Sequence, residues 1–509
     1  MATVPESDRI RFNDDTSWTN WHHTVTQSIA GIYDIYNPAA NVVSFDALKA
    51  TAGVIQLAIG KARAEGKRVR ALGSGWSLSR APTTDGVMLN MSNLNWRMRL
   101  NATTLHPSIT AEQAAGLFLV QGGSNTSEVN KYLESHGRSL RTSGAANGQA
   151  FAGAASTNTH GSALNFGGIM DHIHGIHLVT GKNSWWLERK SRPIMAAGFP
   201  AAIGATLKHD EGDDLFNAAL VSFGAMGVIH AVAIETAPRF LLVAENRIFD
   251  PITPELREVM RTLDFAAHPT LFPKGKPYFL QVVVNPHGTH PAAYVTTMYQ
   301  QPCPADYQPH YEVSGGIKPG YDLLSVLGPV IDKFPQLTPL AAGLAAKELM
   351  NTGSLTGTWG EIFNYKSPQT KVNSGSICVP LEHGLAALDT LLALMKSDGP
   401  VPLVFACRYV RKSPALLAFT RWDMNCVINM DGVFNKSSTA FLARVTDAIE
   451  AKGIPFTQHW GKTFHYTADR LKVYDKLDLW KQARKTLMPD QGDRDAFVSP
   501  WMEPLGLQL

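Results

Sequence analysis

The feature that most constrains this 509-residue chain is the run 143–161, which is built almost only from small or hydroxyl-bearing side chains. Such a run adds little to a hydrophobic core, but it lets backbone N–H groups and hydroxyls approach a ligand closely. A second small-residue turn, residues 73–77, follows a predicted strand at 68–72. One glycine turn alone is usually a tight connection, but two such segments beside strands predict an extended diphosphate ligand. Because the chain has neither a Rossmann glycine fingerprint nor a P-loop, we expect an α/β scaffold of another kind.

The composition excludes several classes of protein. Hydrophobic residues make up 44% and charged residues 17% of the chain, and the formal net charge at pH 7 is +3, too small to predict a nucleic-acid partner. The most apolar segment, 385–395, is too short to span a bilayer, and no signal peptide is recognisable. We therefore expect a cytoplasmic protein of two or three domains that does not enter a membrane. Its cysteines are interpreted as buried small residues in a reducing compartment: Cys303, Cys378, Cys407 and Cys426.

The pattern of hydrophobic residues changes near residue 244. Before it, helical and strand patterns alternate; after it, strand-like runs are interleaved with helices, which favours an α+β unit on a largely antiparallel sheet. The predicted strands are 68–72, 116–120, 228–235, 279–284, 294–299, 403–410 and 425–430. The predicted helices are 47–65, one that follows Asn125 with a capping box and closes at Gly137, and 381–396. The stretches 300–309 and 353–373 are predicted as loops.

Several of these segments resemble one known family. Residues 67–77 resemble the first FAD-binding loop of the vanillyl-alcohol oxidase (PCMH-type) superfamily, and 153–161 resemble its pyrophosphate loop. Residues 171–181 and 222–229 are similar to the strands that follow. Near the C-terminus, the His-Trp-Gly-Lys motif at 459–462 resembles the signature of the aldonolactone and alditol oxidase branch.

The resemblance implies an α+β, two-domain flavoprotein. Both chain ends, 1–243 and 456–509, would form the FAD domain, and 244–455 would form an inserted substrate domain on an antiparallel sheet. It also implies FAD-dependent oxidation of a CH–OH group of an alcohol, sugar or lactone-type small molecule, by hydride transfer to flavin N5. The residues implied for FAD binding are Leu72, Gly73, Ser74, Gly75, Trp76, Ser77, Ser143, Gly144, Gly148, Gly153, Ala154, Ser156, Thr157, His160, Gly161, Gly227, Ile229 and Lys462.

Three residues are candidates for catalysis. By resemblance, Lys462 lies near the flavin ring, where a positive charge stabilises the reduced anion, and Arg408 matches the arginine of a Glu-x-Arg pair. His459 either orients the motif, acts as a base on the substrate hydroxyl, or is a buried structural histidine. Further candidates for the base are left unranked by the sequence: Asp431, Glu361 and Arg421.

The chain departs from the family at five places. Trp76 stands where covalent members carry the histidine that bonds to the flavin 8α carbon, and 143–161 contain no cysteine for a second attachment, so FAD is predicted to be non-covalent. Ala406 replaces the glutamate of the Glu-x-Arg pair, Asn429 stands where a histidine is common, and 376–378 lack a further glutamate. The loss of these polar partners favours a bulky or apolar alcohol over a polyol or aldonolactone.

Two other hypotheses keep the FAD site. In one, FAD serves a non-oxidative or reductive reaction, such as a cyclisation, an epimerisation or a double-bond reduction; in the other, the protein binds flavin without catalysis.

No metal site is predicted at His172, His174 and His177, because alternation along a strand turns His177 away from the other two. Trp359, Tyr409, Trp422 and Trp460 are interpreted as core or as an apolar pocket wall. The substrate, the electron acceptor, the base and the oligomeric state stay open.

Overall fold

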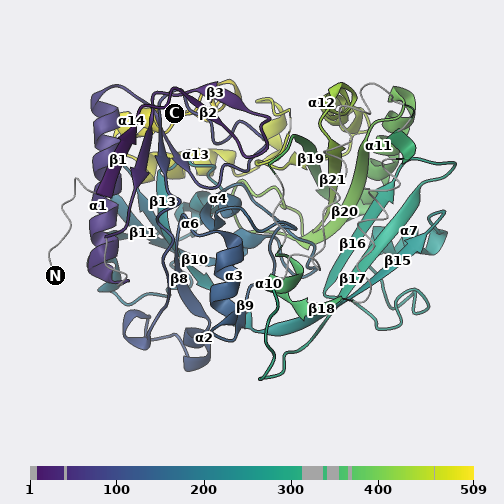
Figure 1. Cartoon of the computed structure of the whole chain (residues 1–509), viewed down its shortest axis with the longest axis horizontal. Coiled ribbons are helices and arrows are strands. Elements are labelled where there is room, and N and C mark those ends of the chain that lie inside the picture. The colour runs from purple at the N-terminus through teal and green to yellow at the C-terminus, as the bar shows by residue number, and fades with distance from the viewer. Residues whose placement is uncertain are drawn as a thin grey trace.

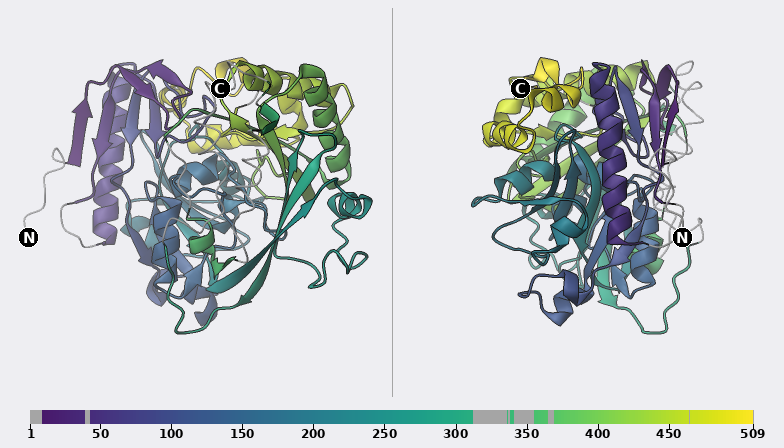
Figure 2. Two further views of the ribbon diagram at one scale, coloured as in Figure 1. Left: turned by 45° about the vertical axis from the view of Figure 1, so that its right-hand side comes forward. Right: turned by 90° about the vertical axis from the view of Figure 1, so that its left-hand side faces the viewer.

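The structure is a computed structural model that describes residues 9–38, 43–311, 336, 338–340, 355–364, 369–463 and 465–508. The part of the chain before about residue 240 and the part that follows it lie side by side, at the left and right of Figure 1. The chain then returns to its first part, since the late helix α14 (Gln491–Ala496) packs against α1 (Phe45–Ala64). Figure 2 shows these last, yellow helices beside the N-terminal elements. Within the described ranges, no helix combines the length and the apolarity needed to cross a bilayer.

Helix α1 illustrates how the N-terminal part is held. Ser44 caps it by accepting a hydrogen bond from the N–H of Ala47 at 3.2 Å, and a stripe of buried residues with helical spacing runs along it. This stripe packs on the four-stranded sheet, whose order is β1-β4-β6-β5. Its strands are β1 (Ile10–Asn13), β4 (Ile32–Ile35), β6 (Val87–Asn90) and β5 (Val69–Leu72), and a hairpin of β2 (Ser17–Thr19) and β3 (Thr26–Ser28) lies beside it.

A six-stranded sheet follows, with the order β12-β11-β10-β13-β8-β7. Its strands are β12 (Thr206–Lys208), β11 (Ser184–Glu188), β10 (Ile173–Val179), β13 (Val228–Glu235), β8 (Leu117–Gln121) and β7 (Arg97–Arg99). A short pair joins β9 (Arg138–Ser139) to β14 (Ala237–Pro238). The helices of this part are α2 (Ala111–Ala115), α3 (Thr126–Glu134), α4 (Phe151–Ser156), α5 (Phe199–Ala202) and α6 (Asp214–Leu220), with 3-10 turns η2 (Ala102–Thr104) and η3 (Ile169–His172).

The second part is built on an eight-stranded antiparallel sheet of order β18-β15-β17-β16-β20-β21-β19-β22. Its strands are β18 (Leu355–Thr358), β15 (Phe240–Phe249), β17 (Ala292–Pro302), β16 (Phe279–Asn285), β20 (Leu403–Arg411), β21 (Met424–Val433), β19 (Val372–Pro380) and β22 (Thr457–Gln458). The remaining elements are α7 (Pro254–Thr262), α10 (Trp359–Ile362), η5 (Leu381–His383), α11 (Gly384–Asp398), α12 (Lys436–Glu450), η6 (Arg470–Val473), α13 (Leu477–Leu487) and η7 (Glu503–Leu505).

The two faces of this large sheet have different partners. Val282, Cys407 and Ile428 belong to the core cluster that packs under α7, α11 and α12. Because successive side chains alternate between faces, their neighbours Arg408 and Asn429 point to the opposite side. That opposite face is the one that carries the polar residues of the site described below.

The predicted α+β class, the antiparallel sheet and each predicted strand are confirmed, with boundaries that shift by one to a few residues. The loop prediction for 353–373 was wrong over β18, α10 and the start of β19, and that for 300–309 was wrong over the end of β17. Residues 353–354 and 365–368 lie outside the described residues. Two smaller corrections concern Cys303, which is partly exposed unlike the three buried cysteines, and residues 222–227, which form a turn before β13.

One buried carboxyl makes stability depend on pH. Glu134, at the end of α3, is 4% exposed and accepts hydrogen bonds from Thr358 and from the N–H of Gly360, but its Oε2 has no described partner. Burial raises the pKa of Glu134 from 4.5 to about 7. The folded state therefore holds this proton more tightly than the unfolded state, so the stabilisation is complete below pH 4.5 and is lost as pH rises through about 7.

We expect Glu134→Gln to raise the free energy of unfolding at pH 8 by up to about 3 kcal/mol relative to the unchanged protein, and to have little effect at pH 5. Urea unfolding at the two pH values measures the difference. Glu382→Gln, a change at an exposed carboxylate, serves as the control and should show no such pH-dependent gain. An equal effect of Glu134→Gln at both pH values would contradict the assignment.

Candidate functional site

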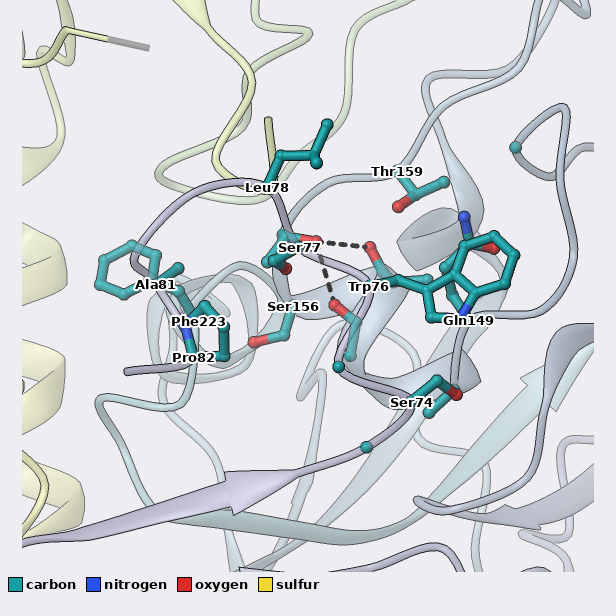
Figure 3. A pocket seen from close by; sticks show the side chains of 18 of the residues that line it. Ser74, Trp76, Ser77, Leu78, Ala81, Pro82, Gln149, Ser156, Thr159 and Phe223 are labelled. Atoms are coloured by element: carbon teal, nitrogen blue, oxygen red, sulfur yellow. Dashed lines mark hydrogen bonds between the residues drawn. The ribbon is translucent and has the colours of Figure 1, made fainter. Parts of the chain in front are cut away.

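A cavity lies between the two small-residue segments and the polar face of the large sheet. Figure 3 draws Ser74, Trp76 and Ser77 of the first loop with Gln149, Ser156 and Thr159 of the second around this cavity. Most residues predicted for FAD binding and all three catalytic candidates line it. These residues are Leu72, Gly73, Ser74, Gly75, Trp76, Ser77, Gly144, Gly153, Ala154, Ser156, Thr157, His160, Gly227, Ile229, Arg408, His459 and Lys462.

The first loop, residues 73–77, needs its glycines for close packing. Gly75 has φ +65°, in the left-handed region, and a Cβ on Gly73 would lie 2.8 Å from the Cβ of Ala150. Trp76 stacks on Trp21 at 5.5 Å between ring centroids. The loop is therefore pressed against the second segment, and the Trp76 indole occupies the position implied for a flavin-linking histidine.

Three residues predicted for FAD binding do not line the cavity. Gly148 is covered by the Trp76 ring, since a Cβ there would lie 2.2 Å from it. Ser143 is fully buried and its hydroxyl accepts a hydrogen bond from Trp359 Nε1 at 2.8 Å. Gly161 packs on the backbone of Ser143, with 2.5 Å between its would-be Cβ and the Ser143 oxygen. Their small size serves packing between segments rather than contact with the cavity.

The second segment contains a short helix, α4, that the sequence analysis did not predict. Phe151 anchors α4 in the main core, while a Cβ on Gly153 would meet nothing within 4 Å. One face of α4 is thus buried and the other opens on the cavity through Gly153 and Ser156. Small residues here leave the backbone and hydroxyl groups accessible to a ligand.

Sequence reasoning also missed several cavity residues: His22, Arg70, Gln149, Thr159, Phe223, Val372 and Ser374. Gln149 and Thr159 lie inside the recognised segment 143–161, so their proximity could have been inferred. Arg70 lies within the recognised run 67–77, whereas His22 and Ser374 belong to no motif and only the folded arrangement brings them to the cavity. Asp431, which the sequence analysis named as one of three unranked bases, also lines it.

The polar wall of the cavity is formed by adjacent strands and the His-Trp-Gly-Lys segment. Lys462 Nζ lies 3.3 Å from Asp431 Oδ1, and the hydroxyl of Ser374 donates to the same oxygen. Arg408 Nε donates to Gln281 Oε1 at 3.0 Å, from β20 to β16. Desolvation lowers the pKa of Lys462, the Asp431 carboxylate opposes this shift, and the charge of Arg408 adds to it.

The histidines of the cavity are neutral near pH 7. Burial lowers the pKa of His459 to about 3 and that of His22 to about 4, and it takes the pKa of His160 well below its ordinary value. His459 Nδ1 accepts the N–H of Gly461 at 3.0 Å. The remaining ring nitrogen of a neutral His459 therefore carries the proton, which favours the orienting role for this residue.

Arg70 provides a direct test of whether the cavity suits a diphosphate. It lines the cavity, is 2% exposed, and forms no ion pair with any described carboxylate. Its Nη1 donates to the carbonyl of Phe223 at 2.8 Å, while its Nε has no described partner. Burial, and then the neighbouring Arg484, lower the pKa of Arg70 to about 9. An uncompensated buried cation beside small-residue loops fits an anionic ligand such as the diphosphate of FAD.

The other constellations do not join the site. Glu361 caps α10 and accepts from the Tyr307 hydroxyl at 2.8 Å, and Arg421 pairs with Asp475 at 2.7 Å. His172 contacts backbone carbonyls, His174 lies 3.1 Å from Glu235, and His177 contacts His230. Among the described residues, no three His, Cys, Asp or Glu side chains form a metal-binding group.

The core interpretation is correct for Trp359, Tyr409 and Trp460, which are fully buried, and Trp422 is partly buried against the core.

Comparison with known proteins gives two family matches. Residues 48–186 match an FAD binding domain, and residues 277–505 match the D-arabinono-1,4-lactone oxidase family. L-Gulono-1,4-lactone dehydrogenase of Mycobacterium tuberculosis is 26% identical over 85% of this chain and 90% of its own. A putative D-arabinono-1,4-lactone oxidase of Neurospora crassa is 29% identical over 38% of this chain and 31% of its own.

Solved structures with the same fold include two cholesterol oxidases. A solvent-stable cholesterol oxidase has a TM-score of 0.69 at 15% identity and covers 99% of this chain and 100% of its own. The cholesterol oxidase from B. sterolicum has a TM-score of 0.71 at 12% identity and covers 99% of this chain and 98% of its own.

The matched domains, the fold and the cavity together define an FAD-dependent oxidoreductase that acts on a CH–OH group. The predicted cofactor is thereby confirmed. The chain is similar to the vanillyl-alcohol oxidase superfamily and, within it, to the aldonolactone oxidase branch.

Proposed function

We propose that this protein oxidises the hydroxyl-bearing carbon of a small alcohol, sugar or lactone-type molecule at the wall formed by Arg408, Asp431 and Lys462, with FAD held without a covalent bond. The observation that carries the proposal is the meeting of this charged wall with both small-residue segments in one cavity. The division into an FAD domain, 1–243 with 456–509, and a substrate domain, 244–455, belongs to the same proposal. The cytoplasmic location stays a prediction.

The residues that would hold FAD lie on both sides of the cavity. Residues 73–77 and the cavity-facing part of 144–160 offer backbone N–H groups and the hydroxyls of Ser74, Ser156 and Thr157 to a diphosphate. Arg70 supplies a buried positive charge. Bound FAD supplies the oxidant, because its ring accepts a hydride at N5.

The charged groups of the cavity favour the formation of negative charge there. Lys462 and Arg408 are cations on its wall, and the three histidines stay neutral near pH 7. Positive groups already fixed in place stabilise the negative charge that develops on the ring or on the substrate oxygen. His459 accepts the N–H of Gly461 at Nδ1, so its other ring nitrogen carries the proton and can serve as a hydrogen-bond donor.

Two substrate types are supported by different observations. The names of the relatives in M. tuberculosis and N. crassa support an aldono-1,4-lactone. Ala406 supports a second candidate, an alcohol with an apolar body, because Ala406 packs in a small apolar cluster of its own with Val283 and Val404 on the same sheet face. This cluster lies beside the cavity lining, and the hydroxyls of a sugar ring that reached it would be left unpaired.

An anaerobic screen tests the function. The purified holoenzyme is mixed with L-gulono-1,4-lactone, D-arabinono-1,4-lactone, D-sorbitol or cyclohexanol, and the visible flavin absorption band is followed. We expect at least one compound to bleach it, with faster bleaching by cyclohexanol if the apolar wall dominates specificity. If dithionite bleaches the flavin and none of the compounds does, the proposal is wrong.

The mode of flavin attachment gives a separate prediction. Trp76 has no nucleophilic atom to bond the 8α carbon, so we expect acid precipitation to release all of the flavin into the supernatant. The absorbance of the supernatant and the in-gel fluorescence of the denatured chain measure the two fractions. Yellow colour retained on the precipitated chain would contradict non-covalent binding.

A further inference from the structure

We infer that Asp431 is the catalytic base, accepting the proton of the substrate hydroxyl while the hydride leaves the carbon; this inference rests on the proposed function. Asp431 is the one carboxylate among the described residues that line the cavity. Its side chain is 15% exposed, so it is reachable from the cavity while remaining within its wall. Position 406 holds alanine and contributes no carboxylate of its own.

The register of the large sheet explains how Asp431 reaches this region. Ala406 on β20 pairs directly with Asn429 on β21, and Val404 pairs with Asp431. Residues that are opposite in an antiparallel pair share a face, and diagonal neighbours remain within reach of side chains. Asp431 therefore projects from the same face as Ala406 and Arg408, one strand away, and delivers a carboxylate to the surface that Arg408 also lines.

The contacts of Asp431 leave one oxygen for a substrate. Lys462 lies 3.3 Å from Oδ1, and Ser374 donates its hydroxyl to the same atom. No described group forms a hydrogen bond with Oδ2 of Asp431. The two donors fix the orientation of the carboxylate, and the second oxygen is available to accept a hydroxyl proton.

Three other titratable groups of the cavity, His459, Lys462 and His160, suit this role less well. His459 uses Nδ1 to accept the N–H of Gly461, so its other nitrogen is a donor. Lys462 beside the Asp431 carboxylate is a cation and has no lone pair to offer while it remains protonated. His160 Nδ1 contacts the carbonyl of Gly161, and only 3% of the residue is exposed to solvent. Glu361 and Arg421, the two other candidates, lie outside the cavity lining.

The step balances with FAD as the oxidant. With FAD bound, the O–H bond would break and its proton would pass to Asp431 Oδ2. The C–H bond would break with its electron pair leaving as a hydride that the flavin accepts, and the C–O bond would become a carbonyl. The substrate is oxidised by two electrons and FAD is reduced by two. Lys462 compensates the charge of the Asp431 carboxylate before the step. Once that carboxyl is protonated and neutral, the positive charge of Lys462 would be left to stabilise the anionic reduced flavin.

Asp431→Asn tests the inference, because an amide keeps the shape and one acceptor oxygen but accepts no proton. Stopped-flow spectroscopy measures the anaerobic rate constant of flavin reduction by each compound of the screen across pH 5–10. We expect the variant to reduce about 100-fold more slowly. FAD content and reduction by dithionite should remain unchanged.

Two controls separate a base from a structural group. Glu361→Gln changes a carboxylate of the same part of the chain outside the cavity and should leave the rate constant unchanged. Asp431→Glu restores a carboxylate and should recover part of the lost rate constant. If the unchanged protein is bleached by a compound and Asp431→Asn is bleached equally fast, the inference alone is wrong. If no compound bleaches the unchanged protein, the proposed function fails, and this inference with it.

Discussion

Lys462→Met is expected to lower the rate constant of anaerobic flavin reduction by about 100- to 1000-fold, the loss typical when one fixed electrostatic donor is removed from an enzyme site. Lys462 is the cation that bridges the C-terminal segment and β21 at the cavity, through its 3.3 Å contact with Asp431. Methionine has a similar length and no charge. The variant should still bind FAD, because the small-residue segments and Arg70 are unaffected, so the loss appears in the reduction step.

The pH profile identifies the protonated ammonium as the acting form. Desolvation lowers the pKa of Lys462 below its ordinary 10.5, and the Asp431 carboxylate limits that shift. The protonated form is lost as pH rises through the lowered pKa, so we expect the reduction rate to fall on the alkaline side. Lys462→Arg should retain much of the rate and remove this alkaline decline, since a guanidinium stays protonated. Lys485→Met, at an exposed lysine of α13, is the matched control and should change neither quantity. Equal rates in Lys462→Met and the unchanged protein would contradict an electrostatic role.

The cofactor side of the cavity could be predicted from sequence because its residues are neighbours in the chain. Gly73, Gly75 and Gly153 stand in two segments rich in small residues, and such segments let a backbone approach a ligand closely. Three residues of the second segment that were predicted to bind FAD do not line the cavity, because they pack against other parts of the chain: Ser143, Gly148 and Gly161. Gly148 is hidden because the Trp76 ring of the other segment lies on it, and no local pattern encodes that contact.

The substrate side depends on strand order, which local sequence does not specify. Ser374 and Asp431 form a hydrogen bond although they are 57 residues apart, and they meet because β19 pairs with β21 in one particular register. A shift by one residue would turn Asp431 into the core beneath α12. The same long-range pairing explains why 355–358 and 372–373 are strands despite their loop-like composition: each acquires its strand structure from a partner, β15 or β21.

Arg70→Met is expected to weaken FAD binding by about 10- to 100-fold, the factor that corresponds to the loss of one charge-assisted hydrogen bond. Arg70 is buried on the cavity wall without a described anionic partner, and a second buried cation, Arg484, lowers its pKa further. Such a charge is costly in an empty cavity and is compensated when a diphosphate enters. We therefore expect Arg70→Met to weaken the binding of the phosphate groups of FAD and to leave the binding of its ring unchanged.

Riboflavin, which lacks the diphosphate, makes this distinction measurable. Fluorescence titration of the apoprotein should show a loss of FAD affinity in Arg70→Met with little change in riboflavin affinity. Arg484→Met is the matched control: Arg484 is equally buried and donates to the carbonyl of Ala225 at 2.8 Å, but it does not line the cavity. We expect it to lower stability while preserving the ratio of FAD to riboflavin affinity. Equal losses for both ligands in Arg70→Met would instead assign Arg70 to holding the Phe223 turn, where its Nη1 donates to the backbone at 2.8 Å.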